Sequence, residues 1–201
     1  MNGIECQGEV FYPTKIVCVG RNYVEHIREL NNEIPKEMVL FNKPNSSINE
    51  ELYFVSEDNH YEAEISFLIK DGDIFAVGFG LDITKRELQS KLKKRGLPWE
   101  RAKAFDKSAV FSRFIKIDSV EEINLELYIN NTLVQKGGVD LMIYKPNMIL
   151  NEIKDFMTLE DFDIVMSGTP KGVGSYKKGD RFKGVLKNGN KTLISKSWIV
   201  K

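Results

Sequence analysis

Three acidic residues have the types and spacing of a site for a hard divalent cation. Glu62 and Glu64 are two positions apart in the otherwise apolar segment 61–69, and residues i and i+2 of a β-strand point to the same face. Two carboxylates about 7 Å apart along a strand repel each other unless they are solvated, protonated or bridged by a cation. Asp82 lies between an apolar strand and the start of a helix, where its position is well fixed. Such oxygen ligands favour Mg²⁺, Mn²⁺ or Ca²⁺.

Several other residues suit a substrate that carries a carboxylate. Arg86 and Gln89 are three residues apart on an expected helix and share a face, and arginine can hold a carboxylate through two parallel hydrogen bonds. Lys103 lies between two alanines, which leave room for a buried approach. Gly168 and Thr169 begin a glycine-rich segment whose successive N–H groups could bind an anion.

A histidine and a glutamate have the spacing of a general-base pair. His26 and Glu29 are three residues apart and meet on one turn of an expected helix. A carboxylate in that position orients the imidazole and stabilises its protonated form.

From spacing alone, each of these groups also has a purely structural interpretation. The two glutamates could lie on a solvated strand face, Asp82 could cap a helix, and Lys103 could be a surface lysine. His26 could pair with Glu29 on a helix surface, and the glycine-rich segment could be a tight turn. Only a solvated helix face is expected for the next four cations: Lys91, Lys93, Lys94 and Arg95.

The elements that must position these residues are mostly short strands. Apolar runs bounded by turn residues predict strands at 15–19, 61–69, 73–79, 110–117, 124–129 and 162–166. Helical spacing predicts helices at 22–30, 84–95 and 147–156. The middle helix should begin with a capping box of Thr84 and Glu87, bury Leu88 and Leu92, and end at Gly96. Turns are expected at 71–72, 130–131 and 188–189, and residues 31–60 should be irregular.

Length and composition are those of an ordinary globular protein. The 201 residues suit one domain, and 29 basic against 29 acidic residues give a formal net charge of zero, which does not indicate a nucleic-acid or membrane partner. The two cysteines, Cys6 and Cys18, are interpreted as free thiols in a reducing cytoplasm. The first residues do not have the basic start and apolar stretch of a signal peptide, so none is expected. No apolar run approaches the roughly 18 residues that a membrane span needs.

Five ordered blocks resemble the fumarylacetoacetate hydrolase family, in particular its acylpyruvase-like branch. They are KIVCVGRNYVEHIREL, FNKPNSSI, YEAEISFLI, LDITKRELQSKLKKRGLPWERAKAFD and SGTPKGVG, and the resemblance runs from about residue 15 to 186. It implies a predominantly β, α+β fold: a mixed β-sheet roll with few short helices, like the family's C-terminal domain. It also implies a single catalytic domain over 1–201 that forms a homodimer.

The same resemblance assigns roles to the residues singled out above. It implies that Glu62, Glu64 and Asp82 hold Mg²⁺ or Mn²⁺, with Lys103 beside metal and substrate. The substrate pocket would be lined by Arg86, Gln89, Gly168 and Thr169. His26 and Glu29 would be the water-activating pair on a lid, which we expect near residues 24–36.

The leading expectation is hydrolytic C–C cleavage of a 3-acylpyruvate, or a related short 2,4-dioxo acid, to pyruvate and a carboxylic acid. His26, held by Glu29, would take a proton from the attacking water, and Lys103 would add positive charge where an enolate forms. On the same site the alternatives are an oxaloacetate decarboxylase or tautomerase, or a 2-hydroxy-dienoate isomerase or decarboxylase. A non-catalytic binding module is the alternative from another class. The fold by itself does not decide among them.

Overall fold

The computed structural model describes residues 1–29 and 36–201, and its centre is a mixed sheet of short strands. The strand order is β4-β3-β14-β7-β8-β10-β5, and β11 also pairs with β8. The bounds of these strands are β3 Lys15–Gly20, β4 Val39–Pro44, β5 Ile48–Asn49, β7 Ala63–Lys70, β8 Asp73–Asp82, β10 Ala109–Phe111, β11 Ile115–Lys116 and β14 Ile164–Met166. The predicted predominantly β, α+β fold is confirmed.

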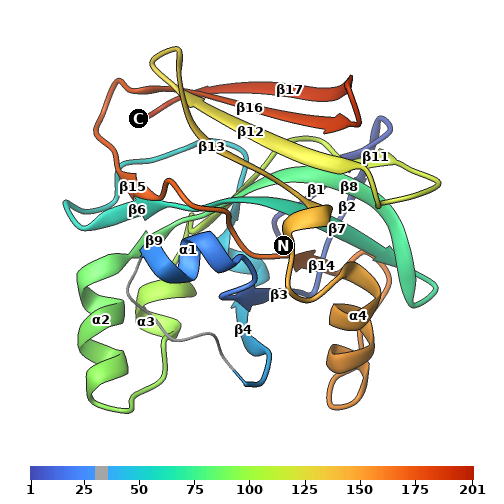
Figure 1. The fold of residues 1–201 in the computed structure, drawn as a ribbon, viewed down its shortest axis with the longest axis horizontal. Coiled ribbons are helices and arrows are strands. Elements are labelled where there is room, and N and C mark those ends of the chain that lie inside the picture. The colour runs from blue at the N-terminus through green and yellow to red at the C-terminus, as the bar shows by residue number, and fades with distance from the viewer. Residues whose placement is uncertain (30–35) are drawn as a thin grey trace.

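A four-stranded antiparallel sheet of order β13-β12-β16-β17 lies over one face of the central sheet (Figure 1). Its strands are β12 Ile123–Ile129, β13 Thr132–Gly138, β16 Arg181–Asn188 and β17 Lys191–Ile199. Two smaller sheets complete the β-structure: β1 Ile4–Cys6 with β2 Glu9–Phe11, and β15 Gly174–Ser175 with β6 Asn59–Tyr61 and β9 Thr84–Lys85.

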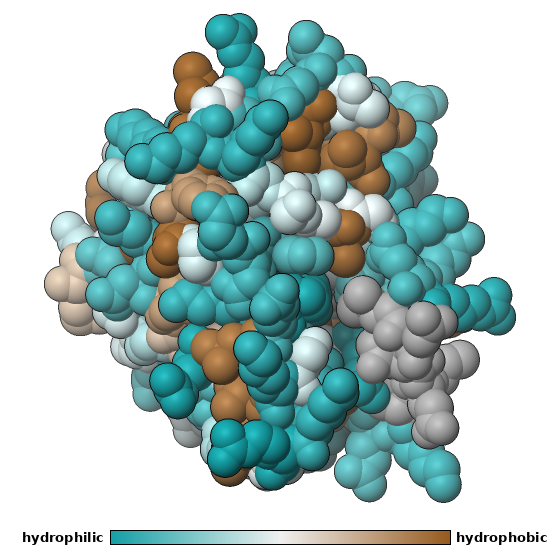
Figure 2. Space-filling view, turned by 90° about the vertical axis from the view of Figure 1, so that its left-hand side faces the viewer, coloured by the Kyte–Doolittle hydropathy of each residue, from teal (hydrophilic) through white to brown (hydrophobic). Residues whose placement is uncertain are grey.

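The helices lie on the other side of the central sheet (Figure 1). They are α1 Val24–Glu29, α2 Arg86–Lys94, α3 Glu100–Lys103 and α4 Pro146–Lys154, with 3₁₀ turns at Asn45–Ser47 and Val139–Leu141. None of the helices in the described part of the chain is long and apolar enough to cross a membrane. The surface on the α2 side is mostly hydrophilic with separate hydrophobic patches (Figure 2).

The central hairpin of β7 and β8 is buried on both faces, which explains its long apolar runs. Alternate residues such as Phe67 and Phe79 face the four-stranded sheet, where the Phe79 ring lies 6.0 Å from that of Trp198. The intervening Leu68 and Ala76 belong to a second apolar cluster on the opposite side. The hairpin turns at Asp71-Gly72, where both residues have positive φ, as the sequence predicts.

The stretch predicted to be irregular contains strands, so that prediction is wrong. β4 pairs antiparallel with β3 from Gly20↔Val39 to Lys15↔Pro44, and β6 forms near its end. β4 is an edge strand, and an edge tolerates a proline that a central strand would exclude. Residues 30–35, which include the end of the expected helix at 22–30 and much of the expected lid, lie outside the described residues.

The predicted capping box is also wrong, although the helix itself forms. α2 begins at Arg86, Lys85 occupies the N-cap position, and no side chain caps the helix. Thr84 instead belongs to β9, where its hydroxyl accepts a hydrogen bond from the buried Lys103. Gln89 and Leu92 form the buried stripe, with Leu88 only partly buried, and Gly96 ends the helix with a φ of 62°.

Candidate metal and substrate site

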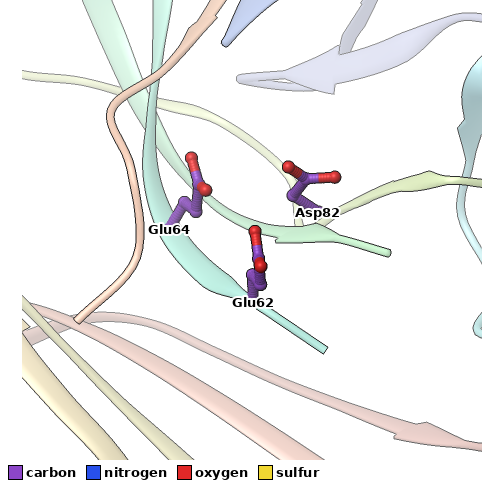
Figure 3. Close-up of side chains that lie close together, drawn as sticks. All are labelled: Glu62, Glu64 and Asp82. Atoms are coloured by element: carbon purple, nitrogen blue, oxygen red, sulfur yellow. The ribbon is translucent and has the colours of Figure 1, made fainter. Parts of the chain in front are cut away.

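The three acidic residues converge from the β7–β8 hairpin. Glu62 and Glu64 point to the same side of the chain, and the Asp82 N–H donates to the Glu62 carbonyl at 2.8 Å, so the end of β8 lies beside them. One carboxylate oxygen from each residue lies within 4.8 Å of the other two (Figure 3). The side chains are buried, with Glu62 6%, Glu64 2% and Asp82 0% exposed. A solvated strand face is therefore excluded for the two glutamates.

Two buried lysines neutralise part of this charge. The Lys103 ammonium donates to Glu62 Oε2 at 2.7 Å, Asp82 Oδ2 at 2.6 Å and Thr84 Oγ1 at 2.6 Å, which uses all three of its protons. Lys43, on β4, has 0% exposure and places its ammonium 2.8 Å from Asp82 Oδ1. It also donates to the Lys103 carbonyl and to Ser108 Oγ. Sequence reasoning missed Lys43 because its strand was not predicted.

The neighbouring charges shift the pKa values of the two glutamates in opposite directions. Burial raises the pKa of Glu62, but the cations of Lys103 and Arg86 outweigh it and hold that pKa well below its usual value. For Glu64, burial and the carboxylates of Asp82 and Glu62 raise the pKa well above its usual value. Burial lowers the pKa of Lys103, but Asp82 and Glu62 outweigh it and raise it overall.

The donor set fits a hard divalent cation. All three side chains offer carboxylate oxygens in a buried cluster, which is the chemistry that Mg²⁺, Mn²⁺ and Ca²⁺ prefer. Glu64 has no ion pair with any described cation, and its Oε2 accepts one hydrogen bond from the Gly168 N–H at 2.8 Å. Asp82 Oδ1, despite the nearby Lys43, accepts no hydrogen bond of good geometry from the described residues. A cation would satisfy both groups.

The residues predicted to contact substrate surround this cluster. Arg86 forms an ion pair with Glu62 and donates to Gln89 Oε1 at 2.9 Å. The Thr169 hydroxyl donates to the Ala63 carbonyl at 2.9 Å and accepts from Gln135 Nε2 at 2.8 Å. Gln135, on β13, therefore holds the glycine-rich segment against β7. Sequence reasoning did not identify it because β13 was not predicted.

His26 and Glu29 are paired on α1. His26 Nδ1 lies 3.2 Å from Glu29 Oε2, and the imidazole is nearly buried, with the residue 5% exposed. The Glu29 carboxylate accepts from the Gly172 N–H, at 3.0 and 3.1 Å to its two oxygens. His26 also lines the cavity described below. Its Nε2 atom has no hydrogen-bond partner among the described residues.

One cavity brings these groups together. It is lined by His26, the three carboxylates, Arg86, Gln89, Lys103 and Thr169, and by further residues that include Arg21, Phe41, Lys93 and Trp99. Lys91, Lys94 and Arg95 are exposed, as predicted, but the prediction of a solvated face is wrong for Lys93. Lys93 follows Arg86 by seven residues and Gln89 by four, so helical periodicity was the signal that could have found it.

The chain is similar to known proteins over most of its length. The family model described as fumarylacetoacetate (FAA) hydrolase C-terminal matches residues 15–194. Oxaloacetate tautomerase oaa1 of Schizosaccharomyces pombe is 38% identical over 188 residues, which are 83% of this chain and 85% of that protein. Oxaloacetate tautomerase YcgM of Escherichia coli is 37% identical over 190 residues, covering 84% of this chain and 87% of that protein.

A solved structure agrees with the fold. The fumarylpyruvate hydrolase of Pseudomonas aeruginosa, in complex with Mn²⁺ and pyruvate, superposes with a TM-score of 0.88 at 28% identity. The match covers 99% of this chain and 95% of that one.

Proposed function

We propose a function for this chain, which belongs to the fumarylacetoacetate hydrolase family. In this proposal it is a metal-dependent enzyme that interconverts the keto and enol forms of oxaloacetate. The observation that carries the proposal is the buried cluster of Glu62, Glu64 and Asp82 with Lys103 on the wall of one cavity. The activity named for the two relatives favours this alternative over the hydrolysis that the sequence alone put first.

The proposed reaction moves one proton and needs no co-reactant. Glu62, Glu64 and Asp82 would hold a divalent cation, with Mg²⁺ proposed as the native ion and Mn²⁺ or Ca²⁺ as substitutes. When bound, this ion would supply Lewis-acid polarisation of the 2-oxo group. His26 Nε2 takes a proton from C3 of the keto acid, so that the C3–H bond breaks and the C2=C3 double bond forms. The same nitrogen then returns the proton to the 2-oxo oxygen.

The protein's own residues prepare this transfer. The Glu29 carboxylate fixes the His26 ring through Nδ1, which directs Nε2 to the proton transfer. The Lys103 ammonium adds positive charge where negative charge develops on the substrate, and it is already held by three hydrogen bonds. Arg86, Gln89, Gly168 and Thr169 are proposed to bind the 1-carboxylate end of the substrate.

Hydrolysis of an acylpyruvate is the second candidate. The His26–Glu29 pair could equally activate a water molecule, and the Pseudomonas aeruginosa neighbour is a fumarylpyruvate hydrolase. The two reactions differ in whether water reaches the cavity with the substrate bound. We further propose that residues 1–201 form one catalytic domain, that the enzyme is a homodimer, and that it works in the cytoplasm, for which the buried free thiols Cys6 and Cys18 offer support.

The deciding experiment compares three reactions with one preparation. Oxaloacetate tautomerisation, oxaloacetate decarboxylation and acetylpyruvate hydrolysis are each measured with Mg²⁺, with Mn²⁺ and with EDTA. We expect tautomerisation to be fastest, to require the cation, and to be abolished in Asp82→Asn. The control Asp118→Asn removes an exposed carboxylate outside the cavity and should keep wild-type rates. Faster hydrolysis than tautomerisation, or full activity with EDTA, would contradict the proposal.

Replacing His26 by alanine tests the proton-transfer role. General-base catalysis typically contributes about 10²–10⁴-fold, so tautomerisation should fall by that order. Decarboxylation of oxaloacetate depends mainly on the cation and should fall much less. A His26→Ala enzyme that loses both activities equally, or neither, would assign His26 another role.

A further inference from the structure

Lys93 lies on the cavity wall at the far end of α2 from the Arg86–Glu62 ion pair. Arg86, Gln89 and Lys93 occupy positions i, i+3 and i+7, so they form one face of the helix, and all three line the cavity. The Lys93 ammonium lies 4.5 Å from the centroid of the Trp99 ring, which also lines the cavity. This cation–π contact fixes the lysine along the wall instead of leaving it in solvent.

The charge of Lys93 is not used by the metal cluster. Lys103 and Arg86 are ion-paired with the carboxylates, whereas Lys93 forms no ion pair with any carboxylate in residues 1–29 and 36–201. Burial, together with the cations of Arg21 and Arg86, lowers the pKa of Lys93 to about 8. The ammonium of Lys93 therefore gives this part of the cavity a positive charge, which suits an anion.

We propose that Lys93 binds the second carboxylate of a 2-oxo dicarboxylate and so selects dicarboxylates over monocarboxylates of the same length. The inference rests on the proposed function for the identity of the 2-oxo end of the substrate. That end is held at the carboxylate cluster, and the helix face of α2 joins it to Lys93. A four-carbon chain carries its two carboxylates at opposite ends, which matches two separate anion sites in one cavity.

An apolar chain is the competing occupant of this region. A partly apolar groove adjoins the cavity and shares Phe41, Trp99 and Lys103 with it. Its other lining residues include Val39, Leu40, Leu97 and Pro98, together with the polar Asn42 and Glu100. An acyl tail in that groove would lie against Trp99 and would offer no partner to the Lys93 ammonium, which contacts the same ring. The unpaired ammonium therefore favours a carboxylate.

The test uses two unreactive ligands that differ only at the end in question. Malate and 2-hydroxybutyrate share a 2-hydroxy acid end, but malate ends in a carboxylate where 2-hydroxybutyrate ends in a methyl group. Their dissociation constants are measured by calorimetry at pH 7 with saturating Mn²⁺. The proteins are the wild type, Lys93→Met, Lys93→Arg and Lys94→Met. Methionine keeps the apolar stem of Lys93 against Trp99, and Lys94 is an exposed lysine on the same helix.

We expect the wild type to bind malate roughly 10- to 100-fold more tightly than 2-hydroxybutyrate, because a charge-assisted hydrogen bond is lost with the carboxylate. Lys93→Met should reduce this ratio to nearly one by weakening malate alone, while Lys93→Arg restores most of it and Lys94→Met leaves it unchanged. A wild type without the preference, or equal losses in Lys93→Met and Lys94→Met, would overturn the inference.

Binding of these ligands is independent of turnover, so the two proposals fail separately. A protein that shows the malate preference but does not tautomerise oxaloacetate supports this inference and refutes the proposed function. An active tautomerase that binds both ligands equally, or that prefers 2-hydroxybutyrate, refutes this inference alone.

Discussion

Glu62 and Glu64 are two residues apart, yet their surroundings give them opposite protonation behaviour. Glu62 is stabilised as a carboxylate by Lys103 and Arg86, whereas burial and two neighbouring carboxylates make ionised Glu64 unfavourable. A pair of carboxylates with such different pKa values is typical of a functional site. In the metal-free protein, Glu64 is the group whose charge a bound cation would stabilise most.

This asymmetry predicts how stability changes with pH. The pKa of Glu64 is raised on folding, so its stabilising effect is complete below its unfolded pKa and is lost as pH rises through the folded value. The pKa of Glu62 is lowered, so its effect is lost only on the acid side, below the usual range. Metal-free protein should therefore melt at a lower temperature at pH 8 than at pH 6, and Mg²⁺ should raise the melting temperature more at pH 8.

Differential scanning fluorimetry with EDTA or Mg²⁺ measures both effects. Metal-free Glu64→Gln, which cannot ionise at this position, should lack the wild-type decline between pH 6 and pH 8. An equal or larger Mg²⁺ effect at pH 6 would show that Glu64 is already ionised in the metal-free protein.

Lys43 should be important for stability because it forms an ion pair with Asp82 and both side chains are fully buried. Replacing Lys43 with methionine leaves the Asp82 carboxylate without that cation, and breaking a buried ion pair costs on the order of 3 kcal/mol. We expect a lower urea midpoint for metal-free Lys43→Met, partly recovered with Mg²⁺ because the ion replaces the missing positive charge. Lys154→Met, at an exposed lysine on α4, is the matched control. No loss of stability in Lys43→Met would mean that the lysine is dispensable.

At the scale of elements, α1 is attached to the glycine-rich segment through Glu29. The Gly172 N–H binds the carboxylate that also holds His26, so a loop following β14 positions a side chain on a helix near the N-terminus. Lys171 adds an ion pair to Glu25 at 2.9 Å, but both side chains are largely exposed and contribute little. The orientation of His26 thus depends on the conformation at Gly172.

Gly172 should tolerate no side chain. Its φ is 98°, and a Cβ atom would meet the Val134 carbonyl oxygen at a distance that real Cβ atoms do not reach. Gly172→Ala must therefore shift the loop that donates to Glu29, and the turnover number should fall roughly 10- to 100-fold through misplacement of His26. Mn²⁺ affinity should stay at the wild-type level. Gly179→Ala has similar backbone strain, at a φ of 86°, but open space around the added atom, and serves as control. Equal activity losses in both variants would exclude the positioning role.

At the scale of the whole molecule, the site is assembled from parts of the chain that are far apart in the sequence. Residues of β3, α1, β4, the β7–β8 hairpin, α2, α3 and the loop after β14 line its cavity. The expected homodimer remains a prediction, supported by a net charge of zero, which opposes association little. Light scattering coupled to size-exclusion chromatography at micromolar concentration should give twice the chain mass of 23.1 kDa. A mass equal to one chain would contradict it.

Local patterns in the sequence were sufficient for much of the fold. The alternation that puts Glu62 and Glu64 on one face follows from strand geometry, and the turn at Asp71-Gly72 follows from residues that accept positive φ. Apolar runs located β3, β7, β8, β12 and β14, because short-range patterns record which residues are buried. The strand β4 was not predicted because its proline was interpreted as a break in regular structure. At the edge of a sheet a proline is tolerated, since its nitrogen need not donate a hydrogen bond to a neighbouring strand.

The partners of the buried charges were decided only by the tertiary structure. β14 pairs with both β3 and β7, which brings β3 and its neighbour β4 to the hairpin and places Lys43 at Asp82. In the same way, Lys93 reaches the cavity because α2 packs with that face inward, while Lys91 and Lys94 on the same helix stay exposed. The local sequence around a lysine does not show whether its side chain is solvated or buried. That depends on contacts with residues far away along the chain, which only the tertiary structure brings together.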